Sequence, residues 1–242
     1  MNQGVTRKCN PSFFSERMID RTPRAFVFDA YGTLFDVHSV SALAEELAPG
    51  QGAILSQIWR SKQLQYTWLQ SLMIPAQARD DFERITAKAL DYAISQLMVP
   101  LGVAERARLV DAYRRLTPFP DAADALADLA PRPRWILSNG TFAMLEPLVR
   151  ESTLAPHVDG ILSVDAAGVY KPAPRVYQLA VDATRCAPGE IAFVSANGWD
   201  AGGAKAFGFM TIWINRLGEP VERHAPEPDF IVGSLSHIAG LA

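Results

Sequence analysis

The sequence contains little cysteine and histidine, and it has no long apolar run. Its 242 residues include only two cysteines, Cys9 and Cys186, and four histidines. The cysteines form no Cys-x-x-Cys motif and the histidines share no metal-ligand spacing, so we expect neither a disulfide framework nor a zinc site. No apolar run approaches the roughly 20 residues that span a bilayer. We therefore expect free thiols in a reducing, cytoplasmic compartment and no membrane partner.

The charge balance also excludes several classes of protein. The chain carries 23 Lys and Arg against 26 Asp and Glu, a net charge of −3, so it lacks the basic footprint of a nucleic-acid-binding domain. No Gly-x-Ser-x-Gly occurs, which argues against the α/β-hydrolase fold. Residues 1–23 lack the apolar stretch of a secretory signal, and we expect them to form an N-terminal extension. A hydrophobic content of 49% predicts an ordinary globular protein.

The order of apolar runs predicts an α/β fold with a helical insertion. Residues 25–28 are wholly apolar, which is typical of a buried parallel strand. Proline and glycine separate helical patterns in the next 80 or so residues. We expect those helices at 39–48, 53–72, 79–98 and 104–116. Nothing in this stretch resembles a strand.

The last part of the chain alternates short apolar runs with helical stretches, which is typical of right-handed crossovers. We expect strands at 134–137, 161–164, 191–194, 210–214 and 230–232, and helices near 121–130, 143–151, 175–183 and 200–207. The prediction is a doubly wound, mostly parallel Rossmann-like core made by residues 24–36 and 119–242, with an all-helical domain at 37–118. A single helix-rich domain with one continuous core is the alternative.

The residues after the first strand carry the strongest functional signal. Asp29 follows the apolar run directly, and Gly32 and Thr33 follow in a tight turn. Open α/β sheets bind their ligands at the carboxyl ends of strands, so the Asp29 carboxylate is placed to act as a nucleophile. An Asp at a strand end can also be a cap or an ion-pair partner. Position 31 is Tyr, where a phosphoryl-transfer site of this shape would usually carry a second Asp.

Two further strands are expected to end in small polar residues. Ser138 and Ser195 follow the apolar runs at 134–137 and 191–194. Because parallel strands end at one edge of a sheet, we expect both serines to lie near Asp29. The alternative for Ser138 alone is a helix N-cap.

The segment from Phe28 to Asp36 resembles the first motif of the haloacid dehalogenase superfamily, a hydrophobic strand followed by Asp-x-x-x-Thr. Most members of that superfamily are magnesium-dependent phosphatases with Asp-x-Asp, whose second Asp protonates the leaving alcohol. Ala30-Tyr31 lacks this acid, and a departing halide needs no proton. The resemblance therefore points to the L-2-haloacid dehalogenase branch. It covers nearly all of residues 24–238 and implies that the helical insertion is a cap that closes over the strand ends.

The resemblance also implies how a substrate is bound. Ser138, Lys171 and the backbone N–H groups of Ala30 and Tyr31 would hold the substrate carboxylate. The residues that would stabilise the leaving halide are Arg60, Asn139 and Trp199. The segment from Trp59 to Leu69 closely resembles the matching stretch of L-2-haloacid dehalogenases.

Arg60 has no acidic neighbour at helical spacing. Its apolar neighbours predict a largely buried helix, in which an unpaired guanidinium needs an anion from elsewhere. A bound halide or carboxylate would supply that anion. An inter-helix ion pair is the alternative.

Lys171, in the Lys-Pro pair of the third motif, would keep Asp29 ionised. Thr33 would steady the same carboxylate through its hydroxyl. Tyr177 is expected either to hydrogen-bond to this network or to pack in the core. A solvated surface charge is the ordinary alternative for a lone lysine.

The loop from Phe193 to Asp200 resembles the fourth motif. Phosphatases place two acids there for magnesium, whereas Asp200 is the only acid here, so we expect no metal and no cofactor. Ser195 and Asn197 supply the other polar groups. Asp200 could cap the following helix, or pair with Lys171 and, with Asn197, orient a hydrolytic water.

The prediction is a metal-independent hydrolase that converts short L-2-haloalkanoic acids to D-2-hydroxy acids with inversion, through an aspartyl ester on Asp29. A magnesium-dependent phosphatase acting on a small phosphate ester is the first alternative, and a non-catalytic anion-binding relative is the second. The apolar helix at 53–72 and the family resemblance also predict a homodimer.

Overall fold

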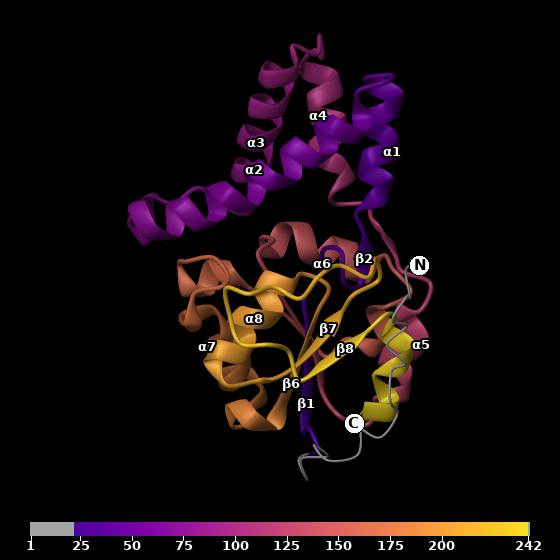
Figure 1. Cartoon of the computed structure of the whole chain (residues 1–242), viewed down its shortest axis with the longest axis vertical. Coiled ribbons are helices and arrows are strands. Elements are labelled where there is room, and N and C mark those ends of the chain that lie inside the picture. Colours follow the sequence, from indigo (N-terminus) through magenta and orange to yellow (C-terminus); the bar gives the residue numbers. More distant parts are fainter. Residues whose placement is uncertain (1–21, 242) are drawn as a thin grey trace, which may run out of the picture.

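The computed structural model describes residues 22–241. Cys9 and almost all of the predicted extension at 1–23 lie outside the described residues. Figure 1 shows a central sheet with α7 and α8 on one side and α5 on the other, and a group of four helices, α1–α4, beyond one end of the sheet. The sheet and its flanking helices place polar side chains at the end of the sheet that faces α1–α4.

The sheet has six strands that pair in parallel. They are β1 (Ala25–Phe28), β4 (Arg134–Ser138), β5 (Gly160–Ser163), β6 (Ile191–Ser195), β7 (Met210–Ile214) and β8 (Phe230–Val232), in the order β5-β4-β1-β6-β7-β8. β1 lies inside the sheet, and its four side chains are at most 1% exposed, which explains why this strand is apolar throughout. The predicted doubly wound α/β class is confirmed.

Helices connect the strands and cover both faces of the sheet. They are α5 (Ala122–Asp128), α6 (Phe142–Arg150), α7 (Pro174–Thr184) and α8 (Gly198–Phe207). Thr141 caps α6 by accepting a hydrogen bond from the Met144 N–H, and Pro174 occupies the first turn of α7, where its missing N–H costs nothing. Short 3₁₀ segments complete this part of the chain: η3 (Ala155–His157), η4 (Val164–Ala167), η5 (Pro188–Glu190), η6 (Leu235–His237) and η7 (Ala239–Leu241).

Four helices follow one another after the first strand and pack together (Figure 1). They are α1 (His38–Leu47), α2 (Gly52–Met73), α3 (Phe82–Leu97) and α4 (Val103–Ala112), with the short η2 (Ala76–Ala78) before α3. The predicted helix at 79–98 begins three residues later, because Asp81 caps α3 by accepting a hydrogen bond from the Arg84 N–H.

Two very short strands lie where the chain leaves and rejoins the sheet region. β2 (Phe35–Asp36) pairs antiparallel with β3 (Thr117–Pro118). The expectation that 37–118 contains no strand was therefore wrong at its last two residues. A strand of two residues is too short to show the apolar–polar alternation from which strands are predicted. Pro118 also argues against a strand, because proline is tolerated only in edge strands such as this one. The division at 37–118 itself remains a proposal.

The expectation that α2 is largely buried was also wrong. Its buried residues, Gly52, Leu55, Trp59, Gln63 and Thr67, recur every three or four positions and form one face. Other apolar residues of α2 are exposed, with Leu72 at 83% and Met73 at 68%. Among the helices of residues 22–241, none is long and apolar enough to cross a membrane.

Candidate active site

The carboxyl ends of three neighbouring strands form one polar site. Asp29 follows β1, Ser138 ends β4 and Ser195 ends β6, and β1 pairs with both β4 and β6. Chain order reverses across β1, so the helices on either side diverge and leave a crevice at this edge. The turn after Asp29 requires glycine at position 32, where φ is +85°.

Three donors hold the carboxylate of Asp29, a residue that is only 6% exposed. The Thr33 hydroxyl donates to Oδ2 at 3.1 Å, and the Asn197 amide donates to the same oxygen at 2.8 Å. The ammonium of Lys171 donates to Oδ1 at 3.0 Å. Oδ2 thus has two donors and Oδ1 has one, so Oδ1 keeps more of its acceptor capacity free.

Lys171 also binds a second carboxylate behind the first. Its Nζ donates to Asp200 Oδ2 at 2.8 Å, and the hydroxyl of Ser195 donates to the same oxygen at 3.1 Å. The other oxygen of Asp200 accepts a hydrogen bond from the Tyr177 hydroxyl at 2.8 Å. Lys171, Asp200, Tyr177 and Ser195 are all at most 1% exposed, so this network is shielded from water.

A glycine allows α8 to approach this network closely. A Cβ atom at position 203 would come within 2.7 Å of the Tyr177 hydroxyl and 2.5 Å of Pro172. Both distances are closer than a real Cβ atom tolerates. Gly203 therefore brings the first turn of α8, with Asp200, against the residues that surround Lys171.

Burial and charge shift the pKa values of this network. Burial alone would lower the pKa of Lys171, but the carboxylates of Asp200 and Asp29 reverse this effect and raise it. Burial also raises the pKa of Asp200, and the nearby Lys171 opposes that shift. The pKa of Tyr177 is raised well above its ordinary value, chiefly by burial and then by Asp200. Lys171 is thus held as a cation between two carboxylates.

Arg60 reaches this edge of the sheet from α2. Its guanidinium donates to the Gln63 amide oxygen at 2.6 Å and to the Asn197 amide oxygen at 3.5 Å. Gln63 in turn donates to the hydroxyl of Thr86 on α3 at 2.7 Å. Arg60 is half-buried rather than buried, and no ion pair of residues 22–241 includes it. Its positive charge is thus oriented by two amides and is left available to an anion.

A small cavity is lined by both Asp29 and Arg60. Polar residues from the sheet edge line one part of it, and Leu64, Phe82 and Trp199 contribute apolar surface. The full lining is Asp29, Tyr31, Arg60, Leu64, Phe82, Ser138, Asn139, Lys171, Asn197 and Trp199. An anion in this cavity would meet the charges of both Arg60 and Lys171.

Several donors around the cavity have no partner in the protein. The Asn139 oxygen accepts a hydrogen bond from the Lys171 backbone N–H at 3.1 Å, which leaves the amide nitrogen for a ligand. Ser138 accepts a hydrogen bond from the Gly140 N–H at 3.2 Å. Across residues 22–241, no protein acceptor receives a hydrogen bond from the backbone N–H of Ala30 or Tyr31. The Asn139 amide nitrogen and these two backbone N–H groups are therefore donors without an acceptor in the described part of the protein, at this end of the sheet.

Four of the residues expected in the site lie behind the cavity. Thr33, Ser195 and Asp200 hydrogen-bond to lining residues but do not line the cavity. Tyr177 lies one step further away and hydrogen-bonds to Asp200. Asp200 does not cap α8, whose N-cap is Asn197. Because both Asp200 oxygens are occupied by protein donors, its most direct action is on Lys171. Over residues 22–241, no three or more His, Cys, Asp or Glu side chains gather as a metal ion would require.

Sequence reasoning missed Gln63, Leu64 and Phe82. Gln63 and Leu64 lie three and four residues after Arg60 on α2, so helical spacing predicts that they are its neighbours, but it does not assign them to the cavity. Phe82 starts α3 and has no such local signal, because its position depends on how α3 packs against α2.

Comparisons with known proteins agree on one family. A family model described as haloacid dehalogenase-like hydrolase matches residues 23–208. The (S)-2-haloacid dehalogenase of Pseudomonas sp. (strain YL) is 44% identical over 220 residues, covering 90% of this chain and 94% of that protein. The corresponding protein of Xanthobacter autotrophicus is 41% identical over 241 residues, with 90% and 94% covered.

Solved structures give the same result. The crystal structure of an L-2-haloacid dehalogenase matches with a TM-score of 0.88 and 44% identity, over 90% of this chain and 98% of that chain. The Xanthobacter autotrophicus enzyme with chloropropionic acid covalently bound matches with a TM-score of 0.85 and 40% identity, over 91% and 98% of the two chains.

The buried ion pairs predict how the protein responds to Lys171→Met. Removing the ammonium leaves two buried carboxylates uncompensated, which we expect to lower the free energy of unfolding by about 3–5 kcal/mol. Adding Asp200→Asn to this variant should restore most of the loss. Burial raises the pKa of Asp200, so its charged form costs most above that pKa. The loss of unfolding free energy in Lys171→Met, relative to wild type, should therefore shrink as the pH falls through the pKa of Asp200.

Urea unfolding followed by circular dichroism, at neutral and mildly acidic pH, measures these changes. Lys88→Met is the matched control, because the Lys88 side chain is 60% exposed beside Asp80 and such pairs contribute at most about 1 kcal/mol. Equal losses for the two lysine variants would contradict the assignment of Lys171 as a buried, charge-compensating residue.

Proposed function

Since the chain belongs to the haloacid dehalogenase-like hydrolase family, we propose that it hydrolyses short L-2-haloalkanoic acids to D-2-hydroxy acids. The product has inverted configuration at C2, and the reaction passes through an ester on Asp29. The curated relatives named (S)-2-haloacid dehalogenase, and the related structure that holds chloropropionic acid covalently, support this activity. The enzyme is a hydrolase that acts on carbon–halide bonds.

The observation that carries the proposal is a nucleophile without a neighbouring acid. Position 31 is Tyr, and burial, followed by the charges of Tyr113 and Asp29, raises the pKa of its hydroxyl. A phenol of raised pKa is a poor proton donor to a leaving alkoxide. A halide leaves without a proton, so this site suits carbon–halogen cleavage better than phosphate ester hydrolysis.

In the first step the substrate carboxylate binds to Ser138, Lys171 and the backbone N–H groups of Ala30 and Tyr31. The freer oxygen of Asp29, Oδ1, then attacks C2 from the side opposite the halogen. A carbon–oxygen bond forms, and the halide departs with the electron pair of the carbon–halogen bond. Fixing this in-line geometry can contribute several of the roughly 7–11 kcal/mol available from effective molarity.

Arg60, Asn139 and Trp199 receive the departing halide. Negative charge moves from Asp29 to the halogen during this step, toward the guanidinium that Gln63 and Asn197 orient. Donors placed where charge develops stabilise the transition state by about 3–4 kcal/mol each. The edge of the Trp199 ring carries the positive part of its quadrupole and favours an anion.

In the second step water attacks the carbonyl carbon of the Asp29 ester. The hydroxy acid leaves with the original Asp29 oxygen, and the overall reaction releases one proton. Asn197 lies at the cavity and orients the water. Asp200 lies behind it and, with Tyr177 and Ser195, holds Lys171 charged and in place. Thr33 fixes the rotamer of Asp29. No metal or cofactor takes part in this scheme.

The helices α1–α4 are proposed as a cap at residues 37–118 over a core made by 24–36 and 119–242. The cap supplies Arg60, Leu64 and Phe82 to the cavity, and the core supplies the nucleophile. Closing the two parts would replace water around Asp29 with fixed dipoles. The net charge of −3 argues against a nucleic-acid partner, and we propose a cytoplasmic site of action for an enzyme of this cysteine usage.

The activity is tested by halide release from each enantiomer of 2-chloropropionate, with a chelator present. We expect chloride from the L enantiomer only, at a rate that the chelator leaves unchanged, and no chloride with Asp29→Asn. Circular dichroism of Asp29→Asn checks that the fold is retained. Hydrolysis of p-nitrophenyl phosphate that requires magnesium, without any halide release, would instead establish the phosphatase alternative.

A homodimer is proposed from the exposed face of α2. Ile54 is 42% exposed, Leu69 41% and Met73 68%, and the three lie at positions that share one side of the helix. Exposed apolar patches of this kind are typical of protein interfaces. A second copy of the chain is the occupant that the family resemblance supports.

Sedimentation velocity tests this assembly. We expect a dimer at micromolar concentration, and a folded monomer for the double variant Leu69→Glu, Met73→Glu, because two buried charges would face each other across the interface. The matched variant Gln96→Glu, which adds a charge at an exposed position of α3, should remain dimeric. A wild-type protein that sediments as a monomer at these concentrations would refute the proposal.

A further inference from the structure

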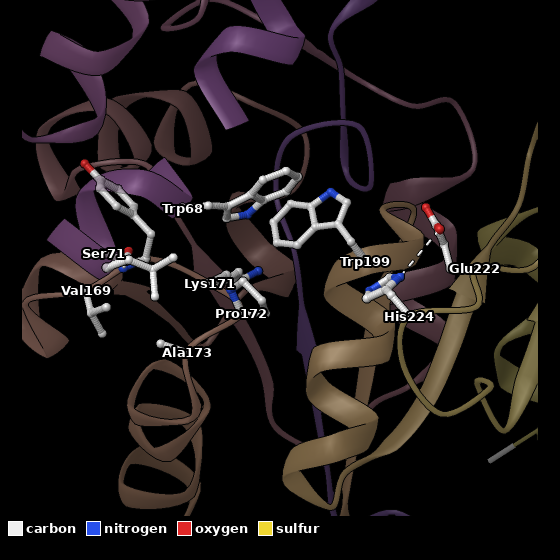
Figure 2. Close-up of a pocket in the computed structure, with 11 residues that line it drawn as sticks. Trp68, Ser71, Val169, Lys171, Pro172, Ala173, Trp199, Glu222 and His224 are labelled. Carbon is white, nitrogen blue, oxygen red and sulfur yellow. Dashed lines mark hydrogen bonds and ion pairs between the residues drawn. The ribbon is translucent and has the colours of Figure 1, made fainter. Parts of the chain in front are cut away.

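A second, larger pocket adjoins the catalytic cavity. It has a volume of about 640 Å³. Its lining is mostly apolar and comes from the end of α2, the loop before α7, the start of α8 and the segment 222–224 (Figure 2). Lys171 and Trp199 line both this pocket and the cavity beside Asp29. The two spaces are therefore neighbours that share a wall.

Two tryptophans meet at this wall. Trp68 comes from α2 and Trp199 from α8, and Figure 2 shows their side chains next to each other above Lys171 and Pro172. Their ring centroids are 5.5 Å apart with an interplanar angle of 77°, which is an edge-to-face contact. Trp199 lines both spaces, whereas Trp68 lines the outer pocket only. Removing the Trp68 ring would enlarge the outer pocket beside Trp199 without altering Asp29.

Trp68 is less firmly held than two other tryptophans of the protein. The Trp59 indole donates to the Thr86 carbonyl at 2.8 Å, and that of Trp213 donates to the Ala196 carbonyl at 3.1 Å. The indole nitrogen of Trp68 is buried and has no hydrogen-bond partner. A buried donor without an acceptor is unfavourable, and rotation of the ring toward the pocket would expose it to water. Trp68 is thus the movable part of the wall.

Resting on the function proposed above, we propose that the outer pocket binds the alkyl tail of 2-haloalkanoic acids longer than propionate. Trp68 is the residue that limits access to it. The inner cavity is small, and in the proposed reaction it must take the carboxylate, C2 and the halogen. A longer tail, with its carboxylate still at Lys171, can extend only past the Trp68–Trp199 wall into apolar surroundings. Each methylene group that is buried there favours binding.

The outer pocket has few groups that would oppose an apolar tail. Glu222 and His224 also line it, and these two exposed side chains lie 3.5 Å apart at one side of the pocket (Figure 2). Val169, Pro172, Ala173 and Leu72 supply apolar surface. The chemistry of the lining therefore favours a hydrocarbon chain over a polar substituent.

The test compares kcat/KM for L-2-bromohexanoate with kcat/KM for L-2-bromopropionate. In Trp68→Ala we expect this ratio to rise about tenfold or more, since a pocket contact with one methylene group changes specificity by roughly 10–200-fold. Trp68→Phe, with a smaller ring and no N–H, should give an intermediate ratio. Because the tail binds in the ground state, the gain should come mainly from a lower KM for the hexanoate.

Filling the outer pocket supplies the matched control. Ala173→Phe places a ring in that pocket, away from the wall. Combined with Trp68→Ala, it should remove the gain for the hexanoate while the propionate rate stays the same. Thermal unfolding and turnover of the propionate check that each variant is folded.

The outcomes separate this inference from the proposed function. If wild type turns over the propionate and Trp68→Ala leaves the hexanoate ratio unchanged or lowers it, the tail does not use the outer pocket. If Trp68→Ala does not fold, the same comparison is made with Trp68→Phe, and an unchanged or lower hexanoate ratio in that variant has the same meaning. A wild-type protein that releases bromide from neither substrate refutes the dehalogenase assignment itself.

Discussion

The contact on which the site depends is the buried ammonium of Lys171 between two carboxylates. It lies 3.0 Å from Asp29 and 2.8 Å from Asp200, and it compensates two carboxylates that are buried close together. The strand order places Asp29 at the crevice, and the close approach of α8 at Gly203 brings Asp200 to the other side. The strand order and the close approach of α8 together place Lys171 between the two carboxylates.

This arrangement explains how one carboxylate can be charged before the first step and neutral after it. When Asp29 becomes an ester it loses its charge, and Lys171 still has Asp200 as a buried partner. The ammonium thus remains compensated through both steps. Arg60, whose hydrogen-bond partners within residues 22–241 are two amides, is the cation that we propose for the halide. Lys171 is paired with carboxylates in the core, whereas Arg60 is not, and this difference is the reason that we propose different roles for them.

The sequence was sufficient for the parts of the protein that depend on local pattern. Asp29 after an apolar strand, the parallel sheet and most helix positions follow from periodicity and from the ends of apolar runs. The resemblance to a family brought Arg60, Lys171 and Asn197 together in advance. The pairing of β2 with β3 and the exposed face of α2 were missed, because both depend on which surfaces meet in three dimensions. The relay from Arg60 through Gln63 to Thr86 crosses two helices, and the Trp68–Trp199 wall joins two parts of the chain far apart in sequence.

The account as a whole requires that an oxygen of Asp29 itself becomes bonded to the substrate carbon. A single turnover with enzyme in excess, in heavy-oxygen water, follows that atom directly by mass spectrometry of the product and of the peptide that contains Asp29. The account predicts a first hydroxy acid molecule without label, and label in the Asp29 carboxylate afterwards. Label in the hydroxyl group of the first product would mean that water attacks C2 directly, and it would contradict the covalent route.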